Sequence, residues 1–176
     1  RDRNGLKELE TVCWVLDICN AKVNDSCGFH VHMDAAGFNL DTWKNLTLTY
    51  KHLEHLIDAF MPRTRRNNTY CKTLSGVSDE RIKSVRTIDG LREVFNNDRY
   101  HKVNFEAYSR HRTVEFRQHS GTTNFTKMEN WIRFLNGLIT FAKRSSLPSR
   151  MTLEELPFLD GKQKLFFKLR TKKLAV

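Results

Sequence analysis

Residues 113–122 read TVEFRQHSGT, and this stretch decides the fold prediction. Apolar and polar residues alternate over the first seven positions, which predicts a half-buried strand. The polar side carries a carboxylate, a guanidinium and an imidazole in one row, on Glu115, Arg117 and His119, each roughly 7 Å from the next. Ser-Gly-Thr then ends the strand ahead of a helix. Such a row is typical of either a solvated strand face or a functional site.

A second stretch, residues 27–34, reads CGFHVHMD and predicts another strand with the same alternation. Its apolar residues point one way, while His30 and His32 point the other. If both strands lie in one sheet over the same core, these two imidazoles meet Glu115 and Arg117 on one surface. We therefore expect a metal and anion site on the polar face of the sheet.

The rest of the chain predicts an α+β fold, in which helices cover an antiparallel sheet. Apolar residues recur at helical spacing in three long segments, 6–22, 39 or 41 to 60 and 123 or 124 to 145, and each is expected to be a helix. Thr87 is expected to cap a shorter helix that runs to Phe95. We expect the first long helix to bury its apolar side, and a short helix to start at Thr152.

Alternation at residues 102–108 predicts a third strand. A turn at 109–112 would join it to the 113–119 strand as a hairpin, so that Asn104 lies on the polar face beside Glu115. With 176 residues and 39% hydrophobic content, the whole chain, residues 1–176, is expected to form a single domain.

Positive charge is the main feature of the composition. The chain carries 30 Lys and Arg against 20 Asp and Glu, a formal charge of +10, which favours an anionic partner such as a nucleotide, acidic peptide, nucleic acid or membrane surface. Residues 62–86 are expected to form a long basic loop, in which Arg63, Arg65 and Arg66 either grip phosphate or carboxylate groups or are simply solvated. The basic arm at 160–176 is either a docked helix or a hook for nucleic acid or membrane.

The sequence shows no sign of a membrane span, a secretory signal or a common zinc motif. No apolar run approaches the roughly 18–20 residues that span a bilayer, and no secretory signal pattern is seen. The four cysteines match no common zinc spacing. We expect reduced thiols in a cytoplasmic setting, with a virion or another particle as the alternative.

Five motifs, in this order along the chain, resemble the amidoligase family. They are CGFHVH at 27–32, PRTRRNNTYC at 62–71, Arg99-Tyr100 with Asn104, TVEFRQHSGT at 113–122, and NWI at 130–132. That family is similar to the carboxylate–amine ligases of the glutamine synthetase superfamily. The resemblance covers about residues 5–158 and implies a glutamine synthetase-like fold. It also implies ATP-dependent formation of an amide or isopeptide bond from an acid and an amine, through an acyl phosphate, with ATP and Mg²⁺ or Mn²⁺ as cofactors.

The resemblance further implies roles for individual residues. His30 and Glu115 would bind the metal. Glu115, Arg117 and His32 would form the catalytic group, with His32 as a nucleotide-phosphate contact or second metal ligand and Arg117 as a clamp for a carboxylate or phosphate. The remaining substrate- and nucleotide-binding residues implied in this way are Arg65, Arg66, Asn104 and His119.

One feature departs from the family pattern. Its members begin with a strand that carries an E-x-E pair of metal ligands. Glu8 and Glu10 have this spacing, but they lie at the start of an expected helix, where residues two apart point to different sides. We therefore expect the chain to be the C-terminal portion of the family fold, completed upstream or by another chain.

Two other functions stay open on the sequence alone. The first is a catalytically inactive, ligase-like module with a structural or nucleic-acid-binding role in a larger assembly. The second is a hydrolase with a histidine-bound metal, in which Asp34 would be the base.

Overall fold

The computed structural model describes residues 3–175 and has an α+β architecture. Three strands form an antiparallel sheet in the order β1-β3-β2, with β1 at Gly28–Asp34, β2 at Val103–Asn104 and β3 at Thr113–Ser120. The seven α-helices of the described residues are α1 Arg3–Ile18, α2 Leu40–Ala59, α3 Asp79–Ser84, α4 Ile88–Val94, α5 Ala107–His111, α6 Phe125–Ala142 and α7 Gly161–Leu174, and a short 3-10 helix, η1, covers Arg63–Arg65.

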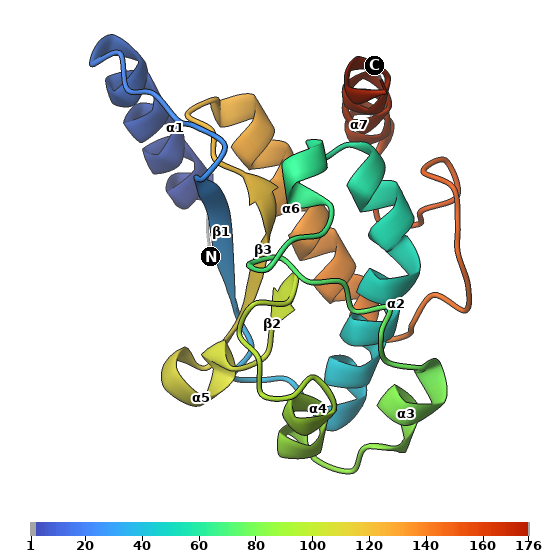
Figure 1. Cartoon of the computed structure of the whole chain (residues 1–176). Coiled ribbons are helices and arrows are strands. Elements are labelled where there is room, and N and C mark those ends of the chain that lie inside the picture. Colours follow the sequence, from blue (N-terminus) through green and yellow to red (C-terminus); the bar gives the residue numbers. More distant parts are fainter. Residues whose placement is uncertain (1–2, 176) are drawn as a thin grey trace.

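The two long helices α2 and α6 cover the apolar face of the sheet and pack against each other (Figure 1). Val31, Val114 and Phe116 are buried on this face, as their alternation predicts. Trp43 of α2 and Trp131 of α6 belong to the same hydrophobic cluster. The opposite face of the sheet is left to polar side chains, so the predicted separation of apolar and polar faces is confirmed for β1 and for β3 as far as Arg117.

Side-chain caps fix the starts of the helices where the sequence predicts them. The Asn39 side chain accepts a hydrogen bond from the backbone N–H of Thr42 (2.9 Å) at the start of α2. Asn124 does the same for Lys127 (3.0 Å) at the start of α6. Each cap satisfies a backbone donor that has no partner within its helix.

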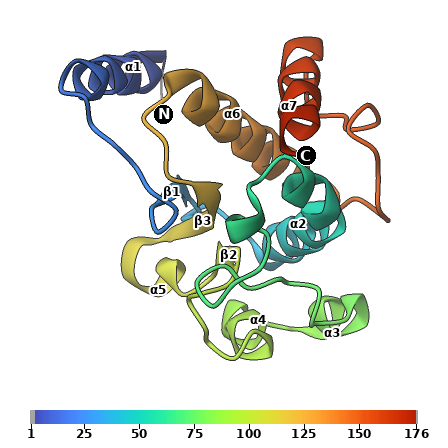
Figure 2. The same cartoon turned by 45° about the horizontal axis from the view of Figure 1, so that its top comes forward.

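The C-terminal basic segment is a helix docked on the body by one apolar side (Figure 2). Phe167 of α7 packs on Phe60 and Phe134, with ring centroids 4.4 and 5.5 Å apart. Leu165 and Leu169, by contrast, are exposed. No helix of the described residues is long and apolar enough to cross a membrane.

The prediction for the first helix is wrong in one respect. Among residues 4–18 of α1 only Cys13 is buried, whereas Trp14 and Ile18 are 63% and 64% exposed. The helix projects from the body and touches α6 on the side of Cys13, whose Sγ lies 3.6 Å from Met128 Sδ (Figures 1 and 2). It ends at Ile18, ahead of the predicted end, because Asn20 takes a left-handed conformation with φ of 53°.

The predicted hairpin is also wrong in its extent. Only Val103 and Asn104 pair with β3. Residues 105 and 106, expected to continue the strand, form a turn, and α5 begins at Ala107. The cause is local, because the Asn104 side chain accepts the backbone N–H of Glu106 (2.9 Å) and turns the chain. The predicted pairing of Asn104 with Glu115 is nevertheless confirmed.

Two connecting segments differ from expectation as well. The predicted long loop after α2 contains η1 and α3, the latter capped by Ser78. No helix starts at Thr152. Its backbone N–H and hydroxyl do bond the Glu155 carboxylate, but the segment forms only a turn, since Pro157 disfavours a helical conformation in the residue before it.

Candidate functional site

A bulge in β3 determines which side chains reach the polar face. Val31 of β1 pairs with Phe116, but Phe29 pairs with His119, so two steps along β1 match three along β3. Arg117 and Gln118 therefore both lie opposite a single residue of β1. A bulge of this kind inserts one residue into a strand, and a shift of one residue moves every later side chain to the other face.

His119 is the residue displaced by this bulge. Its ring lies 5.8 Å from that of Phe29 and 5.7 Å from that of Trp131 in α6, and the residue is 3% exposed. His119 thus faces the core with Phe29. The prediction that it stands in one row with Glu115 and Arg117 is wrong. The sequence alternates without a break through residue 119, but the extra residue in the bulge turns His119 to the opposite face.

Four of the predicted residues do meet on the polar face, around the carboxylate of Glu115. Arg117 Nη1 donates to Glu115 Oε1 at 2.9 Å, and Asn104 Nδ2 donates to Oε2 at 2.6 Å. His30 Nδ1 lies 3.1 Å from Oε1, and His32 Nε2 lies 3.7 Å from it. These side chains come from all three strands, so the sheet itself fixes the cluster.

The cluster keeps Glu115 ionised. Burial alone would raise the pKa of this carboxyl, but hydrogen bonds from His30 and Asn104 and the charge of Arg117 outweigh burial and lower the pKa to about 2. The site therefore presents a carboxylate, not a carboxylic acid, at any pH near neutrality.

Gly28 leaves room for two of the functional side chains. A Cβ at this position would lie 2.7 Å from His30 Nε2 and 3.1 Å from Arg65 Nη2. The first distance is too short for any side chain, so the glycine of the CGFHVH motif is needed for the position that His30 takes.

The two loop arginines lie away from the Glu115 carboxylate. Arg65 is buried and donates to the backbone carbonyls of Arg117 and Gln118, the two residues of the bulge. A bulge disrupts the hydrogen-bond ladder, and the Arg65 guanidinium supplies donors at that point. Arg66 donates from Nε to the Met61 carbonyl at 3.1 Å and lines a different cavity, on the side of α2.

A cavity of about 420 Å³ opens beside the polar face. Its wall includes Glu115, Asn104 and His32, three residues that the sequence predicts for the site. Arg99 and Arg110 are exposed at the same cavity, and neither forms an ion pair with a residue that the structure describes. The cavity therefore combines one buried carboxylate with two guanidinium groups free to bind an anion.

A protein-family model described as "Putative amidoligase enzyme" matches residues 2–139, which include all the residues of this site. The chain belongs to this amidoligase family. No curated protein and no solved structure matches it.

The two exposed arginines and Arg92 are not among the site residues that the sequence predicts. Arg99 belongs to one of the family motifs, and Arg110 lies in a predicted turn. Arg92 lines the cavity from α4 and is held there by the Glu106 carboxylate, which its Nε meets at 2.9 Å. Only the folding of 92–110 around the polar face brings the three guanidiniums together.

Arg117 is fixed more firmly than a substrate clamp would require. Besides its pair with Glu115, its Nε donates to the Tyr70 carbonyl at 3.4 Å, and its guanidinium lies 5.5 Å from the centroid of the Tyr100 ring. The side chain is buried. In this arrangement Arg117 neutralises and orients the Glu115 carboxylate.

The polar face does not form a cage for a resident magnesium ion. Mg²⁺ needs near-octahedral oxygen coordination, and no group of three or more His, Cys, Asp or Glu side chains within residues 3–175 is placed to hold a metal. The single carboxylate, Glu115, already has Arg117 on one oxygen and Asn104 on the other. These side chains could supply only one or two ligands to a cation. They therefore fit a cation whose other ligands come from elsewhere, such as Mg²⁺ bound to nucleotide phosphates.

Proposed function

We propose that this amidoligase-family chain carries out ATP-dependent ligation of a carboxylate to an amine, alone or together with further segments, on a glutamine synthetase-like fold. The match of the family over the whole polar face is the observation that carries the proposal. A buried, ionised Glu115 beside a cavity with two unpaired arginines supports it, because ligation brings together several anionic groups that must be held and neutralised.

The chemistry proceeds in two displacements. A carboxylate oxygen of the acid attacks the γ-phosphorus of ATP, and ADP leaves, so that an acyl phosphate forms. The amine nitrogen then attacks the acyl carbon, the C–O bond to phosphate breaks, and the nitrogen loses a proton. Magnesium bound to the ATP would supply neutralisation of the phosphate charge.

The residues of the chain bind and position the reactants in this scheme. Glu115 and His30 complete the environment of the incoming magnesium–nucleotide complex, and His32, exposed at the cavity wall, contacts a phosphate. Arg99 and Arg110 hold the phosphates and the acid substrate by charge-assisted hydrogen bonds. Asn104 and Arg117 keep the Glu115 carboxylate in place.

Trapping with hydroxylamine tests this function without knowledge of the natural amine. Hydroxylamine captures acyl phosphates as hydroxamates, so the chain is incubated with magnesium–ATP, hydroxylamine and a panel of amino acids and dicarboxylic acids. We expect ADP release and hydroxamate with the right acid. Glu115→Gln is expected to lower the rate of ADP release by about 100-fold or more. Arg99→Gln is expected to raise the ATP concentration at which ADP release is half-maximal.

Arg133→Gln is the matched control, because Arg133 lies on the exposed side of α6 and pairs with Glu129. It should leave ADP release unchanged. Equilibrium dialysis with magnesium–ATP gives a readout that does not depend on the acid. A chain that fails to bind magnesium–ATP, or a Glu115→Gln variant that releases ADP at the unaltered rate, would contradict the proposal.

A second function is favoured by the surface of α7. This helix carries six Lys and Arg residues, and Leu165 and Leu169 lie exposed among them. The surface suits an anionic partner such as nucleic acid, and a ligase-like module that only binds would need no catalytic cycle. Binding to a single-stranded oligonucleotide should then weaken steeply with salt. Lys168→Gln with Lys172→Gln should reduce that slope without disturbing the docked Phe167.

A further inference from the structure

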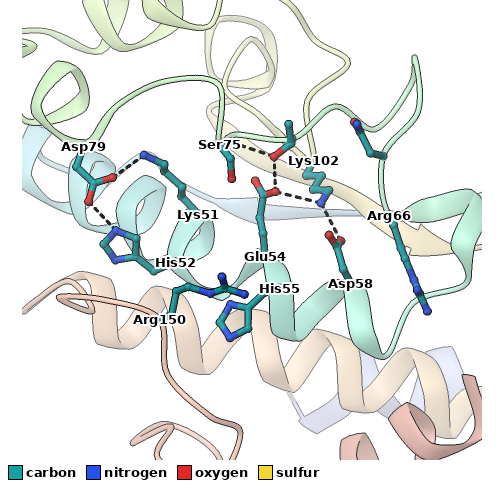
Figure 3. A pocket seen from close by; sticks show the side chains of 12 residues that line it. Lys51, His52, Glu54, His55, Asp58, Arg66, Ser75, Asp79, Lys102 and Arg150 are labelled. Carbon is teal, nitrogen blue, oxygen red and sulfur yellow. Dashed lines mark hydrogen bonds and ion pairs between the residues drawn. The ribbon is translucent and has the colours of Figure 1, made fainter. Parts of the chain in front are cut away.

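A second cavity lies away from the polar face. It measures about 520 Å³ and is bounded by α2, by the segment after η1 and by the segment around Arg150 (Figure 3). It shares no lining residue with the cavity beside Glu115. Because α2 covers the apolar face of the sheet, the two cavities open on different sides of the molecule.

The floor of this second cavity carries an excess of negative charge. Lys102 is 1% exposed, and its Nζ lies 3.1 Å from Glu54 Oε2 and 2.8 Å from Asp58 Oδ1. Two carboxylates thus share one ammonium, for a formal charge of −1. Both carboxylate oxygens of Glu54 already have partners, since they also accept hydrogen bonds from the Thr73 hydroxyl and the Leu74 backbone N–H.

Asp58 keeps one free oxygen. Its Oδ1 accepts from Lys102 and Gln118, whereas Oδ2 accepts no hydrogen bond from the residues that the structure describes. The side chain is 29% exposed, so this oxygen is accessible from the cavity. It is the place on the floor where a cationic group of a ligand can bind.

The rim of the cavity carries positive charge. Arg150 is exposed and has no acidic partner in residues 3–175. The segment that bears it is tied to α2, because His55 Nε2 lies 3.1 Å from the Met151 carbonyl. Arg66 uses only its Nε, toward Met61, and lies at the other end of the cavity beside Asp58 (Figure 3).

The remaining charges of the wall cancel among themselves. Asp79 pairs with Lys51 at 2.6 Å and with His52 at 2.7 Å. The cavity is therefore polarised along its length, with a formal −1 on its floor and the unpaired charge of Arg150 at one end of its rim. A simple anion would leave the negative charge of the floor unneutralised, and a simple cation would leave the positive charge of the rim unneutralised.

We propose that this cavity binds a small zwitterion, an amino acid or a short peptide, with its ammonium on Asp58 Oδ2 and its carboxylate on Arg150. A guanidinium presents two parallel donors that match a carboxylate. The volume lies within the range of small-molecule sites, about 300–1,000 Å³. The proposal is independent of the ligase activity, since it involves none of the residues assigned to that site.

A titration followed by NMR of ¹⁵N-labelled chain tests the proposal, with glycylglycine as the zwitterionic probe. We expect its addition to shift the backbone amides of Thr73, Ser75 and Asn67, which line the cavity. Acetate and ethylamine, each carrying one end of the zwitterion, should bind at least about tenfold more weakly, because each forms only one of the two charged contacts.

The variant Arg150→Gln supplies the second arm. The side chain is exposed, so its loss should not disturb folding, and we expect glycylglycine to bind about tenfold more weakly or worse. Arg144→Gln, in the same segment but outside the cavity, is the control and should bind as the unaltered chain does. Equal shifts with acetate, unchanged binding in Arg150→Gln, or no shifts at tens of millimolar glycylglycine would overturn the proposal.

Discussion

Acid sensitivity of folding is expected to depend on one histidine, His119. Burial lowers its pKa to about 4, against the opposing effect of its hydrogen bond to the Ser120 carbonyl. The positive charges of Arg170, Lys127 and Arg65 lower the pKa of His119 further. His119 is thus neutral in the folded protein at pH values where an exposed histidine would already be protonated.

The sign and size of the effect follow from linkage. In the unfolded chain the histidine has an ordinary pKa of about 6.5. Between about pH 6.5 and 4 the unfolded state therefore binds a proton that the folded state does not, so the free energy of unfolding falls as the pH drops through this window. At about 1.4 kcal/mol per pKa unit, the loss between pH 7 and pH 4 is about 3 kcal/mol. Above pH 6.5 the contribution is fully present.

The variant His119→Gln removes the titrating group and keeps a donor for the Ser120 carbonyl. Urea unfolding at pH 7 and pH 4, followed by fluorescence of the buried Trp43 and Trp131, gives the free energy for each protein. We expect His119→Gln to lose about 3 kcal/mol less than the unaltered chain over this range. His111→Gln, at an exposed site, is the control and should lose as much as the unaltered chain. An unchanged pH dependence in His119→Gln would refute the reasoning.

Three further perturbations have definite expected outcomes. Lys102→Met leaves Glu54 buried beside a second carboxylate with no cation, and should lower the free energy of unfolding by about 3 kcal/mol or more in urea titrations. Gly121→Ala places a Cβ 2.5 Å from that of Cys27, so a loss of about 2 kcal/mol in the same titrations is expected. Glu115→Gln removes a carboxyl whose pKa is lowered to about 2, so the stability that the unaltered chain loses as the pH falls from about 4.5 to 2 should not be lost by the variant in thermal melts.

Much of the fold was predictable because its signals are local. The alternation of β1, the caps Asn39 and Asn124 and the helical periodicity of α2 and α6 each depend on a few adjacent residues. The meeting of His30 and His32 with Glu115 followed from one further step, that two strands with apolar faces on the same core share a polar face.

The errors arise where a contact that the periodicity of the sequence does not reveal decides the outcome, whether that contact is distant or local. The periodicity of α1 predicts an apolar side, but not which part of the body covers it, and Trp14 is left exposed. Asn104 ends its strand by a side-chain bond that alternation cannot reveal. Arg99 and Arg110 are ordinary surface residues in sequence, and they belong to the candidate site only because the chain between α4 and β3 folds over the sheet.

The bulge in β3 accounts for two residues, His119 and Arg65, whose positions differ from those predicted for the site. One extra residue turns His119 into the core, where burial keeps it neutral. The same residue leaves the Arg117 and Gln118 carbonyls to Arg65, so this guanidinium, expected to reach a ligand, instead holds the strand that carries the site. The proposed binding of anionic substrate groups is therefore assigned to arginines outside the predicted set. Arg99 and Arg110, exposed and without an acidic partner in the described chain, are the groups at the Glu115 cavity whose charge is still available to an anion.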